Sequence, residues 1–336
     1  MKNRILHFLS IGLFFTILFT TAAVTKDHYT GSFASTHGAL HVVGADLCDQ
    51  NGDKLQLKGI STHGLHWFPQ FVNRGSFQYF RNHWGANMIR LAMYTGEGGY
   101  LSSQEQQNKL KKQIQDAISS CTDLGMYCII DWHILSDGNP LSHVAEARSF
   151  FAEMSSVYKD HTNILYEICN EPNGNTSWND IKAYAEQIIP VIHANDPDAV
   201  ILVGTPTWSQ AVDQAAADPI RPELATNIMY TLHFYAATHK DELRSKLLSA
   251  RASGLPIFIS EFSTCDASGN GAVDTASANA WFRLIKENNL SYAGWSLCNK
   301  NESSAILKSS TQNTSGNWND HDFSETGLLL KSLMTQ

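Results

Sequence analysis

Two glutamates stand where they could act together on one substrate. Glu261 ends the apolar run Ile257–Glu261, and Glu171 follows the apolar run Ile164–Cys169. A single glutamate at the end of a strand is usually solvated or salt-bridged. Two carboxyl groups that converge on one pocket are the minimum equipment for hydrolysing a glycosidic bond, because one protonates the leaving oxygen while the other attacks or stabilises the anomeric carbon. Surroundings of different charge can give the two groups the different pKa values that these roles need.

Further polar and aromatic side chains follow other apolar runs. The ends of these runs carry Arg90, Tyr94, His133, Asn170, His233, Tyr235 and Trp295. In a barrel of parallel strands, the carboxyl ends of the strands carry the chemistry. We therefore expect these residues to surround the two glutamates in one pocket.

The elements that must position these residues alternate between strand and helix. Apolar, β-branched runs predict eight strands, at Leu55–Ser61, Asn87–Ala92, Tyr127–Trp132, Ile164–Cys169, Val200–Gly204, Ile228–His233, Ile257–Glu261 and Tyr292–Leu297. Helical patterns lie between them, at Gln104–Leu124, Val144–Lys159, Trp178–Ala194, Lys240–Ser253, Thr275–Asn288 and Glu325–Met334. Eight strands separated by helices predict a (β/α)8 barrel, and near-continuous apolar runs are typical of a parallel sheet covered on both faces.

The chain before the barrel has a composition of its own. Residues 1–23 combine basic residues, an apolar run and small residues, which indicates a secretory signal peptide and an extracellular protein. An uncleaved membrane anchor is the alternative, although the run is short for a spanning helix. We expect residues 24–38 to extend the mature chain and residues 39–336 to form one barrel domain, since no repeat or linker interrupts them. Within it, residues 39–56 predict a short β-hairpin, with Asn51–Gly52 as its turn, that could close the bottom of the barrel.

Charge and cysteine content limit the partners. The chain has 24 basic and 32 acidic residues and a net charge of −8, which argues against binding to nucleic acid or to an anionic membrane. Its six cysteines include no CxxC pair, so a zinc knuckle is not indicated, and their disulfide pairing stays open. We expect no metal, no cofactor and a monomer.

Seven segments at the predicted strand ends match one known pattern in order. They are Ser61–Trp67, Ile89–Leu91, Ile130–His133, Tyr166–Pro172, Leu232–Tyr235, Ile257–Phe262 and Trp295–Leu297. Together they resemble glycoside hydrolase family 5, from about residue 39 to residue 327. Within that family, the stretch Asp131–Pro140 and the pair Lys300 and Glu302 are most similar to those of secreted bacterial endo-β-1,4-glucanases, the cellulases.

The resemblance implies a retaining double displacement without a cofactor. Glu261 resembles the nucleophile and Glu171 the acid/base, and their carboxyl groups should then lie roughly 5–5.5 Å apart. Arg90 is the expected charge partner that keeps Glu261 ionised, because a nearby cation lowers the pKa of a carboxyl group. Tyr235 could donate its hydroxyl to Glu261.

Other residues resemble those that bind the sugar. Asn170 resembles the residue that binds the sugar 2-hydroxyl, and His133 and His233 resemble the pocket histidines of the family. Trp295 resembles the aromatic floor before the scissile bond, and Trp178 and Trp208 could form the leaving side. The more distant contacts with the β-glucan polysaccharide are expected at His63, Trp67, Tyr94, Lys300 and Glu302.

Two alternatives stay open at this level. A mannanase or a mixed-linkage β-glucanase would use the same barrel, and the departures Phe262 and Ser263 from the commoner family residues leave the fine preference undecided. A carbohydrate-binding protein without turnover is the alternative of a different class. It would be expected to lack one catalytic carboxylate, whereas Glu171 and Glu261 are both present.

Overall fold

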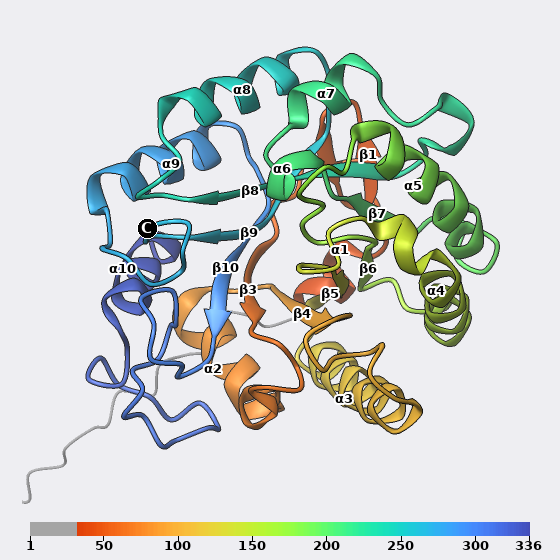
Figure 1. Cartoon of the computed structure of the whole chain (residues 1–336). Helices are drawn as coiled ribbons and strands as arrows, with labels where there is room; N and C mark the ends of the chain where they lie inside the picture. The colour runs from red at the N-terminus through yellow and green to blue at the C-terminus, as the bar shows by residue number, and fades with distance from the viewer. Residues whose placement is uncertain (1–31) are drawn as a thin grey trace, which may run out of the picture. The chain divides into compact units, whose positions relative to one another are not determined.

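The computed structural model describes residues 32–336, and these contain the predicted barrel (Figure 1). Parallel strands close it in the order β10-β3-β4-β5-β6-β7-β8-β9. Their bounds are Lys58–Thr62 (β3), Met88–Tyr94 (β4), Tyr127–His133 (β5), Ile164–Glu167 (β6), Val200–Val203 (β7), Ile228–Tyr235 (β8), Ile257–Ser263 (β9) and Tyr292–Leu297 (β10). All eight predicted strands are confirmed.

Helices surround the strands on the outside of the barrel (Figure 1). The long ones are α2 (Arg74–Trp84), α3 (Gln104–Asp123), α4 (Val144–Tyr158), α5 (Trp178–His193), α8 (Asp241–Ala252), α9 (Thr275–Glu287) and α10 (Glu325–Met334). Shorter helical turns are α1 (Phe33–His37), η1 (Pro69–Phe71), η2 (Pro140–His143), α6 (Pro206–Ser209), α7 (Val212–Ala217) and η3 (Pro222–Leu224). The six predicted helices are confirmed, and α1, α2, α6 and α7 are additional to them.

Burial explains why these segments form strands and helices. Every residue of β4, β5 and β9 is buried, as expected for a sheet packed on both faces. Helix α3 instead buries one stripe, which includes Leu110, Ile114 and Ala117, and leaves the opposite face to water. Its first turn is capped by Ser103, whose side chain accepts a hydrogen bond from the backbone N–H of Gln106.

The predicted hairpin region exists, and it contains two turns. Strands β1 (His41–Val43) and β2 (Asp46–Cys48) pair antiparallel around Gly44 and Ala45. Gly44 has a φ of 61°, the left-handed conformation that a two-residue hairpin turn needs and that glycine adopts without steric cost. Asn51–Gly52 lies in a second turn, after β2, across which Asp49 and Leu47 pair antiparallel with Asp53 and Leu55. The predicted turn is therefore present, and the turn at Gly44–Ala45 is additional to it.

This N-terminal sheet closes the bottom of the barrel. Leucines from residues 39–57 pack against residues of the barrel strands, most of them near the strand starts; the cluster includes Leu40, Leu47, Leu55, Leu57, Met88, Tyr127, Leu165, Val200, Met229 and Phe258. The Tyr127 hydroxyl also donates a 2.7 Å hydrogen bond to the carbonyl oxygen of Gly38. Apolar packing thus seals the end of the barrel opposite to the strand ends that carry the polar residues.

Two further predictions concern the termini and the cysteines. The predicted signal peptide and most of the 24–38 extension lie outside the described residues. Within residues 32–336, no helix is both long and apolar enough to cross a membrane. All six cysteines are buried free thiols, so the pairing left open by the sequence resolves to none in this structure.

Candidate active site

The carboxyl ends of the strands open into one cleft of about 630 Å³. Most residues predicted for the site line this cleft: His63, Trp67, Tyr94, His133, Glu171, Trp208, His233, Tyr235, Glu261, Trp295, Lys300 and Glu302. Arg90 and Asn170 are fully buried beneath it. Trp178 does not line it. Thr207, Gln210, His239 and Ser304 also line the cleft, although the sequence pattern did not single them out.

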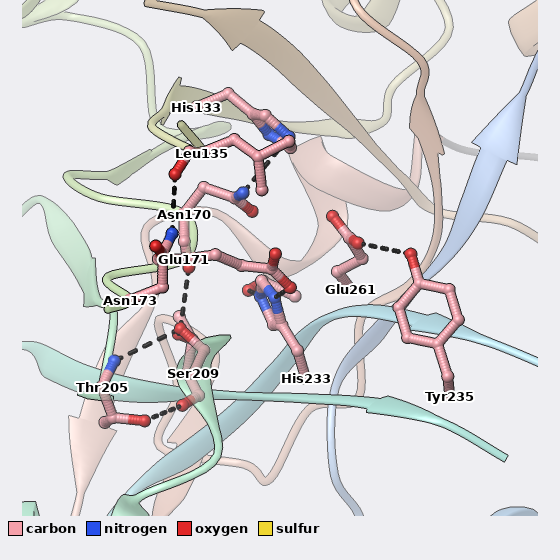
Figure 2. A network of polar contacts seen from close by, with 12 residues as sticks. His133, Leu135, Asn170, Glu171, Asn173, Thr205, Ser209, His233, Tyr235 and Glu261 are labelled. Atoms are coloured by element: carbon pink, nitrogen blue, oxygen red, sulfur yellow. Dashed lines mark hydrogen bonds and ion pairs between the residues drawn. The ribbon is translucent and has the colours of Figure 1, made fainter. Parts of the chain in front are cut away.

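The two glutamates meet in the middle of the cleft (Figure 2). Glu261 lies on β9, and Glu171 lies in the loop after β6. Three atoms lie within 4.8 Å of one another: one carboxylate oxygen of Glu171, one of Glu261 and one ring nitrogen of His233. Both glutamates are buried, with exposed fractions of 9% for Glu171 and 3% for Glu261. Two carboxyl groups this close favour a state in which the pair holds one proton.

Glu261 has two hydrogen-bond donors of its own. Arg90 Nη1 lies 3.1 Å from Glu261 Oε2, and the Tyr235 hydroxyl donates to Oε1 over 3.0 Å. Burial, and next the charge of Glu171, raise the pKa of Glu261 to about 7, although His233 and Arg90 act in the opposite direction. The predicted contact with Arg90 is therefore present. Arg90 lowers the pKa of Glu261 as expected, but it offsets only part of the effect of burial.

Arg90 is shared among several acids, which explains that weak effect. Its Nε and Nη2 bind Glu167 over 2.7 and 3.1 Å, and Nη2 lies 3.0 Å from Asp131. Burial alone would raise the pKa of Glu167, but Arg90 and His233 hold it down at about 2. The sequence reasoning missed Glu167 as a site residue. The sequence does contain a signal for it: Glu167 is an acid inside the apolar run of β6, and a buried acid needs a buried cation as its partner.

His133 and Asn170 form a second buried network (Figure 2). Burial lowers the pKa of His133 well below its usual value, so the ring is neutral. Its Nδ1 lies 2.6 Å from Asp131 Oδ2, which places the proton on Nδ1 and leaves Nε2 to accept from Asn170 Nδ2 over 3.2 Å. Asn170 also donates to the carbonyl oxygen of Ile134 and accepts from Arg90 over 2.6 Å. Both N–H groups of its amide are engaged inside the protein, and its bond to a sugar hydroxyl stays a prediction.

One side of the cleft is built from rings that contact each other; we call His63, Trp67, Tyr94 and Trp295 the stacked wall. Ring centroids lie 5.5 Å apart for His63 and Trp67 and 5.0 Å apart for His63 and Trp295. Trp67 and Tyr94 lie 4.6 Å apart. Next to this wall, Lys300 Nζ binds Glu302 Oε2 over 2.6 Å. This side thus offers apolar ring faces bordered by one ion pair.

The other side carries one exposed ring on an unusual turn; we call Thr207–Ser209 the Trp208 turn. All three residues have positive φ angles, of 59°, 53° and 56°. Ser209 Oγ donates to the carbonyl oxygen of Asn170 over 2.7 Å, which ties the turn to the residue before Glu171 (Figure 2). Trp208 is 45% exposed. The backbone therefore presents this ring to the cleft.

Trp178 does not join Trp208 on this side. It is only 5% exposed, and its indole N–H donates to the carbonyl oxygen of Asp218 over 2.7 Å. Its ring packs near Tyr230, at 5.9 Å between centroids. As the first residue of α5, it lies on the buried stripe of that helix. The structure therefore corrects the expectation that Trp178 forms part of the cleft.

Two clusters among the described residues have the composition of a metal site. One is His63, Cys298 and Glu302, and the other is formed by Glu171, His233 and Glu261. In the first cluster, His63 Nδ1 accepts a hydrogen bond from the backbone N–H of Gly64 over 2.7 Å, so the proton of this neutral ring sits on Nε2, the nitrogen nearest to Glu302. Neither ring nitrogen is then free to bind a metal ion.

The second cluster is unsuited for another reason. The pKa of His233 is raised to about 9, so its ring carries a charge that repels a cation. Neither cluster fits a resident metal ion.

Comparisons with known proteins place the chain among related sequences. The family model described as "Cellulase (glycosyl hydrolase family 5)" matches residues 48–301. An endoglucanase of Clostridium saccharobutylicum is 50% identical over 317 residues, which cover 94% of this chain and 69% of that protein. Endoglucanase 5 of Pectobacterium carotovorum is 40% identical, over 98% of this chain and 64% of its own length. The chain thus spans about two thirds of these relatives.

Solved structures show the same architecture. The catalytic domain of a Thermobifida fusca endoglucanase, in a glutamate-to-glutamine variant complexed with cellotetraose, superposes with a TM-score of 0.86 at 36% identity, over 91% of this chain and all of that one. A structure described as a cellulase superposes equally well, with a TM-score of 0.86 at 42% identity over 92% of this chain and 95% of that chain. By the extent of the family match and the identity to these relatives, the chain belongs to glycosyl hydrolase family 5, the cellulase family.

Proposed function

We propose that this glycoside hydrolase is a secreted endo-β-1,4-glucanase that cleaves internal bonds of β-glucans with retention of anomeric configuration. The observation that carries the mechanism is the approach of Glu171 and Glu261, whose nearest oxygens lie within 4.8 Å. Inverting enzymes hold their carboxyl groups ~6.5–9.5 Å apart to admit a water molecule, whereas retaining enzymes hold them ~5–5.5 Å apart. The short separation favours direct attack by one carboxylate.

In the first step Glu261 is the nucleophile and Glu171 is the acid. Arg90 and the Tyr235 hydroxyl both point at Glu261, so they stabilise its ionised form when Glu171 holds the single proton of the pair. Glu261 attacks the anomeric carbon, the glycosidic C–O bond breaks, and Glu171 protonates the leaving oxygen. A glycosyl ester of Glu261 forms.

In the second step the roles of Glu171 reverse. The leaving sugar has departed, and Glu171, now ionised, takes a proton from water as that water attacks the anomeric carbon. The ester bond to Glu261 breaks, and the pair holds one proton again. The two carboxyl groups share one proton, so the pKa of about 7 at Glu261 describes the pair, and the pair loses this proton above about that pH. Carboxyl titration alone therefore predicts an alkaline limb of activity near neutrality.

The walls of the cleft support a neutral glucan as the substrate. A pyranose ring presents an apolar C–H face, which suits the rings of the stacked wall and Trp208. Lys300 and Glu302 offer charged hydrogen-bonding groups for hydroxyls at the border of the stacked wall. Endoglucanase relatives and the cellotetraose complex of the Thermobifida fusca enzyme point to β-1,4-linked glucose. Export through the N-terminal segment would bring the enzyme to such polymers outside the cell.

The test combines two variants with a panel of substrates. Glu261→Gln and Glu171→Gln should each lower the kcat for carboxymethylcellulose by at least ~10³-fold, because each removes a group that takes part in bond exchange. Unreduced turnover by Glu261→Gln would remove the nucleophile assignment. Product anomers followed by NMR should be β at first, and initial α product would contradict retention. High turnover of mannan with none of carboxymethylcellulose or barley glucan would overturn the glucanase assignment.

A further inference from the structure

A buried chain of hydrogen bonds runs behind Glu171, and the mechanism above does not use it. Glu171 Oε1 lies 2.9 Å from His233 Nδ1, and His233 Nε2 lies 2.9 Å from Ser260 Oγ. Ser260 Oγ donates in turn to Glu167 Oε1 over 2.7 Å. Glu167 and Ser260 are fully buried, and His233 is 1% exposed. The chain therefore joins the cleft to an acid that solvent does not reach.

The hydrogen atoms along this chain can be assigned one by one. Glu167 is ionised, since Arg90 binds both of its oxygens and its pKa is about 2. The single hydroxyl proton of Ser260 points at Glu167, so Ser260 accepts from His233, and Nε2 of His233 must carry a proton. The other ring nitrogen faces Glu171. Either this Nδ1 is protonated beside an ionised Glu171, or it is bare beside a protonated one.

The charges around His233 decide how firmly it holds the second proton. Burial alone would lower the pKa of His233, but hydrogen bonds to Glu167 and Glu171, followed by the charge of Glu261, outweigh burial and raise it to about 9. The charged and titratable groups around it come from four strands: Asp131 and His133 on β5, Glu167 on β6 with Glu171 just after it, Glu261 on β9, and Arg90 on β4, which binds Glu167. Acids outnumber bases among them.

We propose that His233, held in place by Ser260 and Glu167, stores the proton that Glu171 delivers to the leaving sugar, and that Ser260 is a positioning residue of this acid. The inference rests on the proposed role of Glu171 and adds the source of its proton. In the transfer the N–H bond at His233 Nδ1 breaks and an O–H bond forms at Glu171 Oε1. The step is a proton transfer without oxidation or reduction, and it converts the ion pair of His233 and Glu171 into two neutral groups.

Substrate binding favours this transfer for a physical reason. A sugar that fills the cleft displaces water from Glu171, and a buried ion pair without water is costlier than two neutral hydrogen-bonded groups. Rotation of the Glu171 carboxyl group then turns its proton toward the leaving oxygen. His233 keeps its second proton above the pH at which the carboxyl pair loses its own, because the pKa of His233 is higher than that of the pair. The alkaline limb of activity should therefore lie above neutrality.

The decisive variant is Ser260→Ala, with Ser263→Ala as its control. Both serines lie on β9 and are fully buried, but Ser263 contacts Cys265 and takes no part in the chain. Loss of a hydrogen bond to a charged ring should move the alkaline limb of kcat/KM down by about one pH unit in Ser260→Ala. Ser263→Ala should keep the wild-type limb, and Ser260→Thr, which retains a hydroxyl, should restore it. A limb in Ser260→Ala that coincides with that of Ser263→Ala would overturn the proposal.

A spectroscopic measurement on the wild-type enzyme keeps the test independent of folding and of turnover. Nitrogen NMR of the resting protein at pH 8 should show both ring nitrogens of His233 protonated, and a single protonated nitrogen at that pH would also overturn the proposal. His233→Gln identifies the resonance. Failure of the proposed function would look different, because Glu171→Gln would then turn over substrate without loss while the resonance of His233 stayed as described.

Discussion

The two sides of the cleft hold aromatic rings by different means. In the stacked wall, His63, Trp67, Tyr94 and Trp295 contact one another, and Trp295 also stacks on His133 with an interplanar angle of 12°. On the opposite side Trp208 has no ring contact among the described residues, and three successive left-handed residues hold it. Side-chain packing therefore orders one side of the cleft, and backbone conformation orders the other.

This difference has a consequence for what a substitution does. A ring in the stacked wall supports its neighbours, so its removal should weaken both substrate binding and the fold. The ring on the Trp208 turn supports nothing else, so its removal should weaken binding alone. The stacked wall is also fixed before substrate arrives, which reduces the ordering cost of binding. We expect the stacked wall to hold the substrate tightly and the Trp208 turn to hold the leaving part weakly enough to release it.

The largest effect should follow Trp295→Ala. The change removes a ring that is 5% exposed and that contacts His63 and His133, so it leaves a hole and frees two neighbours. We expect kcat/KM for cellopentaose to fall by ~30–1,000-fold, or ~2–4 kcal/mol, together with a lower midpoint of urea unfolding. Trp178→Phe is the control: it should lower stability and leave kcat/KM near that of wild type. An equal loss of kcat/KM in both variants would mean that Trp295 acts through stability alone.

The stacked wall should also make the fold sensitive to acid. Burial, and next the charge of Lys300, lower the pKa of His63 from 6.5 to about 3. The unfolded chain then binds the extra proton between these two values, so stability is present above pH 6.5 and is lost as the pH falls toward 3. Between pH 6.5 and 4 we expect a loss of ~2–3 kcal/mol from this residue. His63→Gln should remove that part of the acid slope in urea unfolding, whereas substitution of the exposed His321 should not.

A smaller effect is expected from Trp208→Ala. One exposed ring stacked on one sugar contributes ~1–1.5 kcal/mol, which corresponds to a roughly tenfold rise in KM. The midpoint of urea unfolding should stay at the wild-type value, since the ring packs against no other ring. Oligosaccharides too short to reach the leaving side should show no change in KM. A stability loss comparable to that of Trp295→Ala would erase the contrast between the two sides.

The sequence predicted the frame of this cleft better than the direction of its rings. Apolar runs located every strand, and their ends located Glu171 and Glu261, because a covered parallel sheet leaves few other places for charge. Trp178 and Trp208 both follow strands, but one falls on the buried stripe of α5 and the other on a left-handed turn that no residue pattern announced. The shared use of Arg90 by Glu167, Asp131 and Glu261 was not predictable either, since it depends on how four strands converge in space.

Thr207 offers the most direct test of whether backbone conformation holds Trp208 in place. A β-branched residue at a φ of 59° is strained, and glycine adopts this conformation freely. Glycine relieves the strain, but it also increases the conformational entropy of the unfolded chain, which opposes the gain. The net result should be a rise of about 1 kcal/mol in the free energy of unfolding of Thr207→Gly. If the strained backbone is what orders Trp208, the same change should raise KM for long oligosaccharides.

Asn289→Gly is the matched control for this change. Asn289 also has a positive φ, of 50°, but it follows α9 and does not line the cleft. Glycine there should leave KM unaltered, and the gain in unfolding free energy should be smaller, because asparagine tolerates the left-handed region better than threonine does. An unchanged KM in Thr207→Gly would instead assign the position of Trp208 to Ser209 and its hydrogen bond to Asn170. Side-chain contacts would then order both sides of the cleft.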